Sequence, residues 1–320
     1  MKVLNSSEIS PFGGLNFVLK EFDTLNISNL LNENLPCLPH QSKYKWKDIL
    51  YSFWSIYFCG GDCIEDLSGN FNQHLKGNPF LKVPSPDRVL ERFKKLSLPK
   101  ENFTVPRGVS NHEFSLHEPL NNLNLQILKL LKFEANEKLT LDYDNTLIFN
   151  NKSDSRWSYK NRSGYCPGVG IIGKKIVYIE NRNGNSDAKT LQNETLSRMF
   201  SLLNKQNIKI HSFRADGASY QMNVLDVVSK NVEKLYMRAC MSDALAREIA
   251  NIDNWEEVNL GTEIGYRGDI IFTPFIRTAK RGKTLDQLKP YRLVVTKTER
   301  GDKQIDLFTN EACNYSAIIT

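Results

Sequence analysis

The sequence predicts an α/β fold with a mixed sheet and flanking helices, a helical region before it and a strand-rich region after it. Three observations predict this arrangement. Apolar residues recur at helical spacing through much of 1–135, strand and helix patterns alternate through 136–254, and strand patterns dominate 255–320. Alternation of the two patterns within one stretch is typical of an α/β core.

The N-terminal region is predicted to be helical because its apolar residues repeat every three to four positions. Gly60-Gly61 stands where a C-cap would end the second helix, and Ser85-Pro86-Asp87 is typical of a helix start. Residues 97–115 are polar and rich in turn formers, which favours a linker. The predicted helices cover 15–31, 46–57, 88–96 and 116–135.

Residues 136–254 are predicted to form the sheet and the helices that cover it. The first strand, 138–149, alternates apolar and polar residues along its length. The elements follow in the order β-β-β-α-β-α-β-α, which indicates a mixed sheet. The remaining predicted strands cover 165–173, 175–181, 208–214 and 234–239, and the helices cover 189–205, 218–229 and 242–250.

The last part of the chain is rich in strand patterns with basic residues between them. Its final residues, Tyr315 to Thr320, have the pattern of a strand interior, so we expect the core to be incomplete at this end. The predicted strands cover 256–260, 269–276, 291–297, 304–309 and 315–319.

The composition is that of a soluble globular protein. The chain has 320 residues, 40% hydrophobic and 24% charged, enough for about two domains of roughly 150 residues each. No run approaches the ~18 apolar residues of a membrane span, and the first residues lack the features of a secretory signal, so we expect a cytoplasmic protein. The net charge of +6 permits a polyanionic partner without requiring one.

The six cysteines are scattered along the chain, which is typical of reduced cytosolic thiols. The tightest pair, Cys59 and Cys63, forms a C-x3-C motif. A structural zinc site needs a second tight pair of ligands. The sequence offers none, so we expect no zinc site here.

Two aspartates on the first core strand are the sharpest chemical feature. Asp142 and Asp144 stand two positions apart and therefore share one face of the strand. Their charges must be paired, hydrogen-bonded or metal-bound if the strand is central in a sheet. The plain alternative is an exposed strand end whose aspartates bond locally.

A third aspartate, Asp216, ends a predicted strand and precedes a helix. Ligands of open α/β sheets bind at this edge, although an aspartate here can also simply cap the helix. Together the aspartates suggest carboxylates that converge on a divalent metal. Mg²⁺ prefers oxygen ligands and keeps several waters, and two such ions can stabilise in-line phosphoryl transfer.

Two other motifs point elsewhere. Gly168 to Gly173 fits G-x-G-x-x-G, but a strand pattern follows it where the dinucleotide fingerprint needs a helix, so we expect a glycine-rich strand or hairpin. Asp142 to Thr146 fits the D-x-D-x-T motif of haloacid-dehalogenase-like phosphatases, whose first Asp is the nucleophile and whose second is the acid/base. That family also has a later acidic motif, and Asp216 lacks the second acidic residue at the required spacing.

The chain resembles the DDE-type cut-and-paste transposases of bacterial insertion sequences, in particular the subgroup with an RNase H-like core interrupted by a β-rich insertion. The resemblance extends over essentially the whole chain, and its motifs are weakly specific singly but strong in this order. They are Ile9–Leu15, Gly60–Leu67, Pro84–Asp87, Leu141–Thr146, Gly164–Pro167, Arg182–Asn185 and Arg214–Asp216.

The resemblance implies that two aspartates and a glutamate hold two Mg²⁺ ions, with Mn²⁺ as a substitute. Asp144 matches the first aspartate best, with Asp142 as the alternate, and Asp216 matches the second. The third ligand should be a Glu on a later helix in a Tyr-x-x-Arg-x-x-x-Glu context, which this sequence lacks. We therefore expect an incomplete copy, and an inactive DNA-binding remnant is the alternative.

The resemblance also implies double-stranded DNA as the partner, both transposon ends and target, bound by a homodimer in the bacterial nucleoid. It assigns 1–135 to DNA-end binding or dimerisation, 136–254 to the RNase H-like catalytic core, 255–314 to the insertion and 315–320 to the start of the last core strand. Basic residues of the insertion would neutralise phosphates, although such a run can also be a solvated loop face. They are Arg277, Lys280, Arg281, Lys283 and Arg292.

Overall fold

The computed structural model has two compact units, which are described separately. The first comprises Met1–Pro99 and His117–Phe133, and the second comprises Lys100–Leu116 and Glu134–Thr320. No helix among the described residues is long and apolar enough to cross a membrane. The structure describes residues 10–69, 71–105, 111–131, 138–261, 263–282, 285–301, 304–305 and 309–320.

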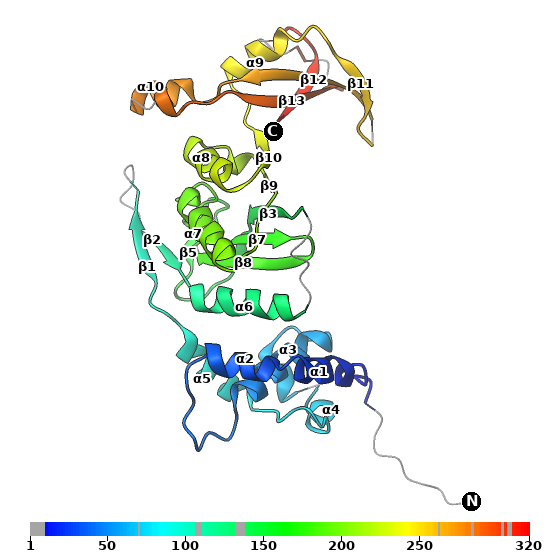
Figure 1. The fold of residues 1–320 in the computed structure, drawn as a ribbon, viewed down its shortest axis with the longest axis vertical. Helices are drawn as coiled ribbons and strands as arrows, with labels where there is room; N and C mark the ends of the chain where they lie inside the picture. Colours follow the sequence, from blue (N-terminus) through cyan, green and yellow to red (C-terminus); the bar gives the residue numbers. More distant parts are fainter. Residues whose placement is uncertain are drawn as a thin grey trace, which may run out of the picture. The chain divides into compact units, whose positions relative to one another are not determined.

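The first unit is helical, as predicted (Figure 1). Its helices enclose an apolar core. The predicted helix over 15–31 is two helices, because Asn26 adopts a left-handed φ of 54° between them. Gly60 takes a φ of 84° just after α3, so the predicted glycine cap is confirmed. The helices are α1 (Leu15–Thr24), α2 (Ile27–Asn34), α3 (Trp46–Phe58), η1 (Ile64–Leu67), α4 (Asn72–Lys76), α5 (Pro86–Leu96) and α6 (Glu118–Leu130).

The second unit is built on an 11-stranded mixed sheet with flanking helices, which is the predicted α/β class. Its order is β1-β2-β8-β7-β3-β9-β10-β14-β13-β12-β11. The strands β3, β9 and β10 run parallel at its centre, and the other pairings are antiparallel. The central strands are β3 (Thr140–Asn145), β7 (Gly168–Ile172), β8 (Lys175–Arg182), β9 (Ser212–Ala215) and β10 (Lys234–Ala239).

The strand-rich end of the chain extends this sheet beyond β10. The strand β14 (Cys313–Ile319) pairs antiparallel with β10 and with β13. The predicted strand over 269–276 instead spans 264–272, because Phe275 has a left-handed φ of 63° and a helix follows. Of the predicted strand 304–309, residues 306–308 lie outside the described part and the others are not in a strand. The remaining elements here are β11 (Glu256–Asn259), β12 (Ile264–Phe272), α10 (Ile276–Gly282), η3 (Leu285–Gln287) and β13 (Tyr291–Glu299).

The predicted linker over 97–115 is wrong in part, because it contains a hairpin that joins the sheet. The strands β1 (Glu101–Thr104) and β2 (Asn111–Ser115) pair with each other, and β2 continues the sheet beyond β8. The reason is apolar packing: Phe114 is fully buried, with the Phe103 ring 4.9 Å away and the Arg182 guanidinium over its face.

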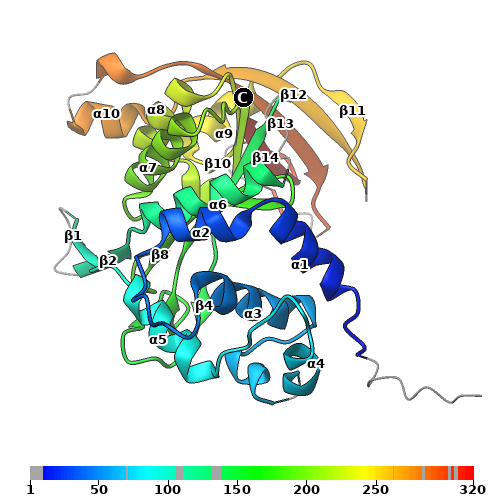
Figure 2. The same cartoon turned by 60° about the horizontal axis from the view of Figure 1, so that its bottom comes forward.

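Helices cover one face of the central strands. The rings of Phe200 in α7 (Gln192–Lys205) and Phe213 in β9 lie 6.1 Å apart. A Cβ at Gly170 would lie 2.5 Å from the Met199 sulfur of the same helix, so glycine allows α7 to approach the sheet closely. The helix α8 (Met222–Asn231) lies beside α7 (Figure 2), and α9 (Asp243–Ala250) packs on β12.

The segment between β3 and β7 forms a small separate sheet. Its order is β4-β6-β5, from β4 (Ile148–Phe149), β5 (Arg156–Trp157) and β6 (Ser163–Tyr165). The long strands predicted over 138–149 and 165–173 are therefore each divided between the two sheets. The predicted glycine-rich hairpin is confirmed, since Gly168 to Ile172 form β7 and Gly173 turns the chain into β8.

Candidate functional site

The two sides of the central strands differ sharply in burial. Leu141, Tyr143 and Phe213 are buried against the helices. Because side chains alternate along a strand, Asp142 and Asp144 point to the opposite face, where Asp144 is exposed. The predicted common face of the two aspartates follows from this alternation.

Asp142 is held by an arginine on the neighbouring strand. Its Cα partner on β9 is Arg214, and both carboxylate oxygens accept from that guanidinium, Oδ1 from Nε at 2.5 Å and Oδ2 from Nη2 at 2.6 Å. The hydrogen bond and the charge of Asp142 raise the pKa of Arg214. The charge of Asp142 is therefore paired, and both of its oxygens are hydrogen-bonded, by Arg214 alone.

Asp144 and Asp216 come to adjacent positions at the carboxyl edge of the parallel strands. The last paired residues of β3 and β9 are Tyr143 and Ala215, and each aspartate is the next residue. Neighbouring strands lie roughly 4.8 Å apart. The sheet therefore brings together the two carboxylates that the sequence singled out.

Each of these carboxylates has one oxygen bonded to the backbone. Asp144 Oδ1 accepts from the amide of Asn145 at 2.7 Å, and Asp216 Oδ1 accepts from the amide of Ala218 at 2.9 Å. Asp216 thus also caps a short 3₁₀ helix, η2 (Gly217–Ser219). Among the described residues, the second oxygen of each is without a hydrogen-bond partner, and both side chains are exposed. Two such oxygens fit Mg²⁺, which takes oxygen ligands and retains waters.

A basic residue that the sequence analysis missed stands next to this pair. Arg238 lies on β10, one residue beyond the last position that pairs with β9, and its neighbours Met237 and Ala239 are buried on the helix-covered face. Its exposed side chain therefore points to the face of Asp144. The alternating burial along β10 could be predicted from its apolar pattern. The position of Arg238 beside Asp216 could not, because it depends on which strands are neighbours in the sheet.

Tyr143 packs tightly on the helix-covered side of β3. This ring is 2% exposed, and burial raises the pKa of its hydroxyl to about 12. A Cβ at Gly168 would lie 2.3 Å from the Tyr143 hydroxyl, so only glycine fits there. This contact holds β3 against β7 at the residue that directly precedes Asp144.

A buried ion pair fixes the adjoining helix. Glu180 of β8 is 1% exposed, and its oxygens accept from Arg198 Nε and Nη2 at 2.9 Å each. Thr195 and Tyr178 add hydroxyl donors at 2.6 and 2.9 Å. Burial alone would lower the pKa of Arg198. The hydrogen bonds to Glu180 and its negative charge outweigh this effect, so the pKa of Arg198 is raised.

The described basic residues that were predicted to contact DNA lie on two elements, α10 and β13. Arg277, Lys280 and Arg281 lie on α10. Arg292 lies on β13 and pairs with Asp269 at 2.7 Å. Lys283 lies outside the described residues.

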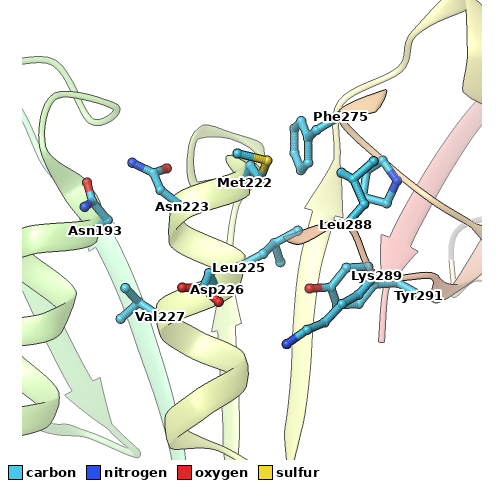
Figure 3. A pocket seen from close by; sticks show the side chains of 11 residues that line it. Asn193, Met222, Asn223, Leu225, Asp226, Val227, Phe275, Leu288, Lys289 and Tyr291 are labelled. Carbon is cyan, nitrogen blue, oxygen red and sulfur yellow. The ribbon is translucent and has the colours of Figure 1, made fainter. Parts of the chain in front are cut away.

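Two cavities adjoin the segment that contains Phe275. The larger, of 320 Å³, includes Tyr220, Cys240 and Arg277 in its wall, and the Cys240 thiol donates to the carbonyl of Gly217 at 3.2 Å. This cavity therefore opens beside the Asp216 loop. The smaller, of 180 Å³, lies between α8 and the residues that lead into β13, with Asp226 on one side and Tyr291 on the other (Figure 3).

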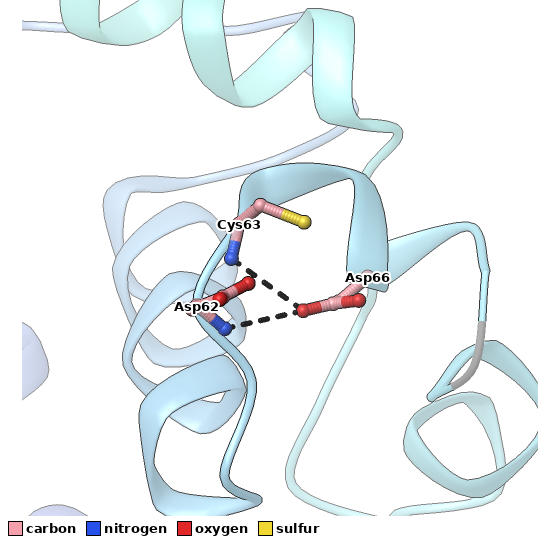
Figure 4. Close-up of side chains that lie close together, drawn as sticks. All are labelled: Asp62, Cys63 and Asp66. Carbon is pink, nitrogen blue, oxygen red and sulfur yellow. Dashed lines mark hydrogen bonds between the residues drawn. The ribbon is translucent and has the colours of Figure 1, made fainter. Parts of the chain in front are cut away.

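The C-x3-C region contains a cluster of Asp62, Cys63 and Asp66, and Figure 4 shows local hydrogen bonding within it. Asp66 Oδ2 accepts from the backbone amides of Asp62 and Cys63 at 3.3 and 3.5 Å. The cluster is thereby explained as the N-terminal cap of η1. Among the described residues, no third His, Cys, Asp or Glu completes a comparable group with Asp144 and Asp216.

No protein-family model matches the sequence, and no curated protein matches it either. Solved structures with similar folds include a Mos1 transposase paired-end complex with the left transposon end, at 13% identity and a TM-score of 0.25 over 62% of this chain. This chain spans 61% of the length of that protein.

Two further solved structures are similar. A Mos1 mariner paired-end complex with Mn matches at 13% identity and a TM-score of 0.24, over 71% of this chain and 78% of that one. A piggyBac transposase synaptic complex with hairpin DNA matches at 10% identity and a TM-score of 0.37, over 98% of this chain and 61% of that one.

Proposed function

We propose that this chain is a DDE-type DNA transposase that cleaves and transfers strands at the ends of an insertion sequence. The observation that carries the proposal is the pair Asp144 on β3 and Asp216 directly after the parallel strand β9. Both are exposed, and each has one oxygen without a hydrogen-bond partner among the described residues. Mg²⁺ held there, or Mn²⁺ in its place, would activate a water and offset charge on the phosphodiester. The DDE resemblance of the sequence supports the same assignment.

The chain's own residues divide the remaining work. Asp144 and Asp216 supply the metal-binding oxygens, and the sheet fixes their separation. Arg238 would hold a phosphate oxygen beside them, since a guanidinium suits phosphate geometry. Arg277, Lys280, Arg281 and Lys283 would neutralise phosphates further along the DNA, and Arg292 would do so less because Asp269 already pairs with it.

Asp142 is assigned a supporting role rather than a metal-binding one. Both of its oxygens are engaged by Arg214, which also disfavours it as the nucleophile of a phosphatase. The assignment extends to the partners: transposon ends and target DNA, bound by a homodimer in the bacterial cytoplasm. Residues 1–135 would bind the DNA end or dimerise, 136–254 would form the catalytic core, and 255–320 would comprise the insertion and the following strand.

The test is Mg²⁺-dependent nicking of a duplex that carries the element's end. Asp144→Asn and Asp216→Asn should each reduce nicking by roughly 10³-fold or more, because loss of a metal ligand removes several kcal/mol of charge stabilisation. Asp142→Asn is the matched control on the same strand and should reduce nicking far less. Arg238→Ala should reduce nicking, with Arg238→Lys recovering part of it.

Binding of Mn²⁺, followed by electron paramagnetic resonance, gives a readout without catalysis. Both Asp144→Asn and Asp216→Asn should weaken it. A wild-type chain that binds DNA and metal but never nicks would identify an inactive remnant. Loss of nicking in Asp142→Asn alone would refute the choice of Asp144, and turnover of small phosphomonoesters would favour the phosphatase.

A further inference from the structure

The hairpin that joins β5 to β6 exposes two aromatic side chains. Trp157 and Tyr159 are each 64% exposed, whereas Trp46 is 2% exposed and the other tryptophans, Trp54 and Trp255, are half-buried. Among the described residues, the Trp157 indole nitrogen has no hydrogen-bond partner. Large rings left in water on an ordered element are typical of a contact surface.

The hairpin tip is held in one conformation. The Ser158 side chain is 3% exposed, and its hydroxyl donates to the carbonyl of Arg162 at 2.7 Å. The Ser158 amide donates to the same oxygen at 2.9 Å, and Asn161 completes the turn with a φ of 55°. Tyr159 and Lys160 therefore stand at the corner of a closed turn, already ordered for binding.

The charge of this segment is basic. Between residues 148 and 165 its cations are Lys152, Arg156, Lys160 and Arg162. Its one acid, Asp154, forms an ion pair with Lys100 and accepts a hydrogen bond from the Tyr165 hydroxyl. Arg162 lies over the Phe149 ring at 4.3 Å, and Lys160 lies 5.2 Å from the Tyr159 ring centre. Among the described residues, neither Lys160 nor Arg162 has an acidic partner. Arg156 pairs with Glu113 at 3.4 Å. Two exposed rings followed by two cations that have no acidic partner in the described part of the chain fit a nucleic acid with unstacked bases.

The hairpin is tied to the strand that carries Asp144. Its sheet begins at Ile148, four residues after Asp144, a span of at most ~14 Å. A bridge between Tyr165 and Asn183 and a bond from the Gly184 amide to the Gly164 carbonyl at 2.9 Å attach it to the end of β8. Trp157 therefore lies on a small sheet that is joined to the chain just after Asp144 and to the end of β8.

We propose that this hairpin, residues 156–162, is a second DNA contact that stacks unpaired bases on Trp157 and Tyr159 and holds the flanking phosphates with Lys160 and Arg162. The inference rests on the proposed DNA substrate but not on the metal site. It assigns recognition of distorted or single-stranded DNA near the cleavage point to a segment outside the basic residues of 277–292.

The test measures affinity of the full chain for a labelled 12-nucleotide single strand by fluorescence anisotropy, in EDTA so that no cleavage occurs. A second oligonucleotide has abasic central positions, which keep the phosphates but remove the bases. Trp157→Ala should weaken binding to the first strand by roughly fivefold to 150-fold, the range for loss of one stacked base. Binding to the abasic strand should change less than about twofold, which is below 0.5 kcal/mol.

Three further variants complete the design. Trp157→Phe should retain most of the affinity because it keeps a stacking face, whereas Lys160→Gln should weaken both oligonucleotides alike. Ile271→Ala truncates another exposed apolar side chain, 69% exposed on β12, and should change neither. Thermal unfolding should be unchanged in Trp157→Ala, because the ring is exposed.

The outcomes separate this inference from the proposed function. Equal binding by wild type and Trp157→Ala, or loss of self-association without loss of DNA affinity, would overturn the stacking role. Base-dependent binding with no nicking would leave the hairpin assignment intact and reject the transposase activity. Failure of the wild type to bind either oligonucleotide would reject the hairpin assignment, whereas the duplex-nicking assay would still decide the transposase activity.

Discussion

Removing Arg198 should destabilise the sheet-bearing unit strongly. Glu180 is 1% exposed, so Arg198→Met leaves a carboxylate buried without its counter-ion. Breaking a buried pair from one side typically costs about 3–5 kcal/mol. Because the hydroxyls of Thr195 and Tyr178 would still donate to Glu180, we expect the lower end, about 3 kcal/mol.

Thermal unfolding followed by circular dichroism or calorimetry measures this change. For a unit of roughly 200 residues, about 3 kcal/mol corresponds to a fall in Tm of about 6–12 °C. The double variant Glu180→Gln with Arg198→Met should recover most of the loss, since a neutral amide needs no counter-ion. Its oxygen can accept from one of the two hydroxyls, and its NH2 group can donate to the other. The matched control is Glu194→Gln, which removes the exposed partner of Arg198 at 3.8 Å and should cost below about 1 kcal/mol.

The reasoning is refuted if Arg198→Met costs no more than Glu194→Gln. It is equally refuted if the double variant is as unstable as Arg198→Met alone, because the uncompensated charge would then not be the cause.

Three other predictions test the supports of the site. Gly168→Ala should cost about 1–3 kcal/mol by urea denaturation, because its Cβ would lie 2.3 Å from the Tyr143 hydroxyl. Adding Tyr143→Phe should restore part of that loss, and no recovery would mean that the clash is elsewhere. Burial disfavours the charged form of Glu113, but hydrogen bonds from Asn183 and Arg156 and the charge of Lys100 outweigh it and lower its pKa. Its ionised form therefore stabilises the fold above pH ~4.3, and that contribution is lost as pH falls through the lowered folded-state pKa. The Tm difference between wild type and Glu113→Gln should be constant from pH 5 to 7 and shrink in stronger acid; a difference that grows in acid would contradict the assignment. Ser158→Ala should cost about 1 kcal/mol and speed amide exchange in the 156–162 hairpin, whereas unchanged exchange would show that the Ser158 hydroxyl does not hold the turn.

The sequence was sufficient for elements whose pattern is local. The strand over 234–239 begins and ends where alternation predicted it. Asp216 was singled out by its position at a strand end, and Asp144 by the strand face that it shares with Asp142 and by the family resemblance. These predictions depend only on residues a few positions apart, which is what periodicity records.

Features that depend on distant partners could not be predicted. The 97–115 segment has the composition of a linker. Its strand β2 nevertheless pairs with β8, where Phe114 stands opposite Arg182, far along the chain. The ion pair between Asp142 and Arg214 and the place of Arg238 both require the strand order and register of the sheet. The sequence around those residues does not indicate which strands are neighbours or in which register they pair.

The placement of Asp144 within a paired strand, with Asp216 directly after one, has a thermodynamic consequence. Asp144 stands opposite Val169 in the β3–β7 ladder, so backbone bonds that form without any ion fix its position. Proteins whose ligands come together only on metal binding spend that binding energy on folding. In this chain the sheet orders the carboxylates beforehand, so the fold should form without the ion. A chelator should therefore lower the unfolding temperature only by the mass-action contribution of a ligand that binds the folded state.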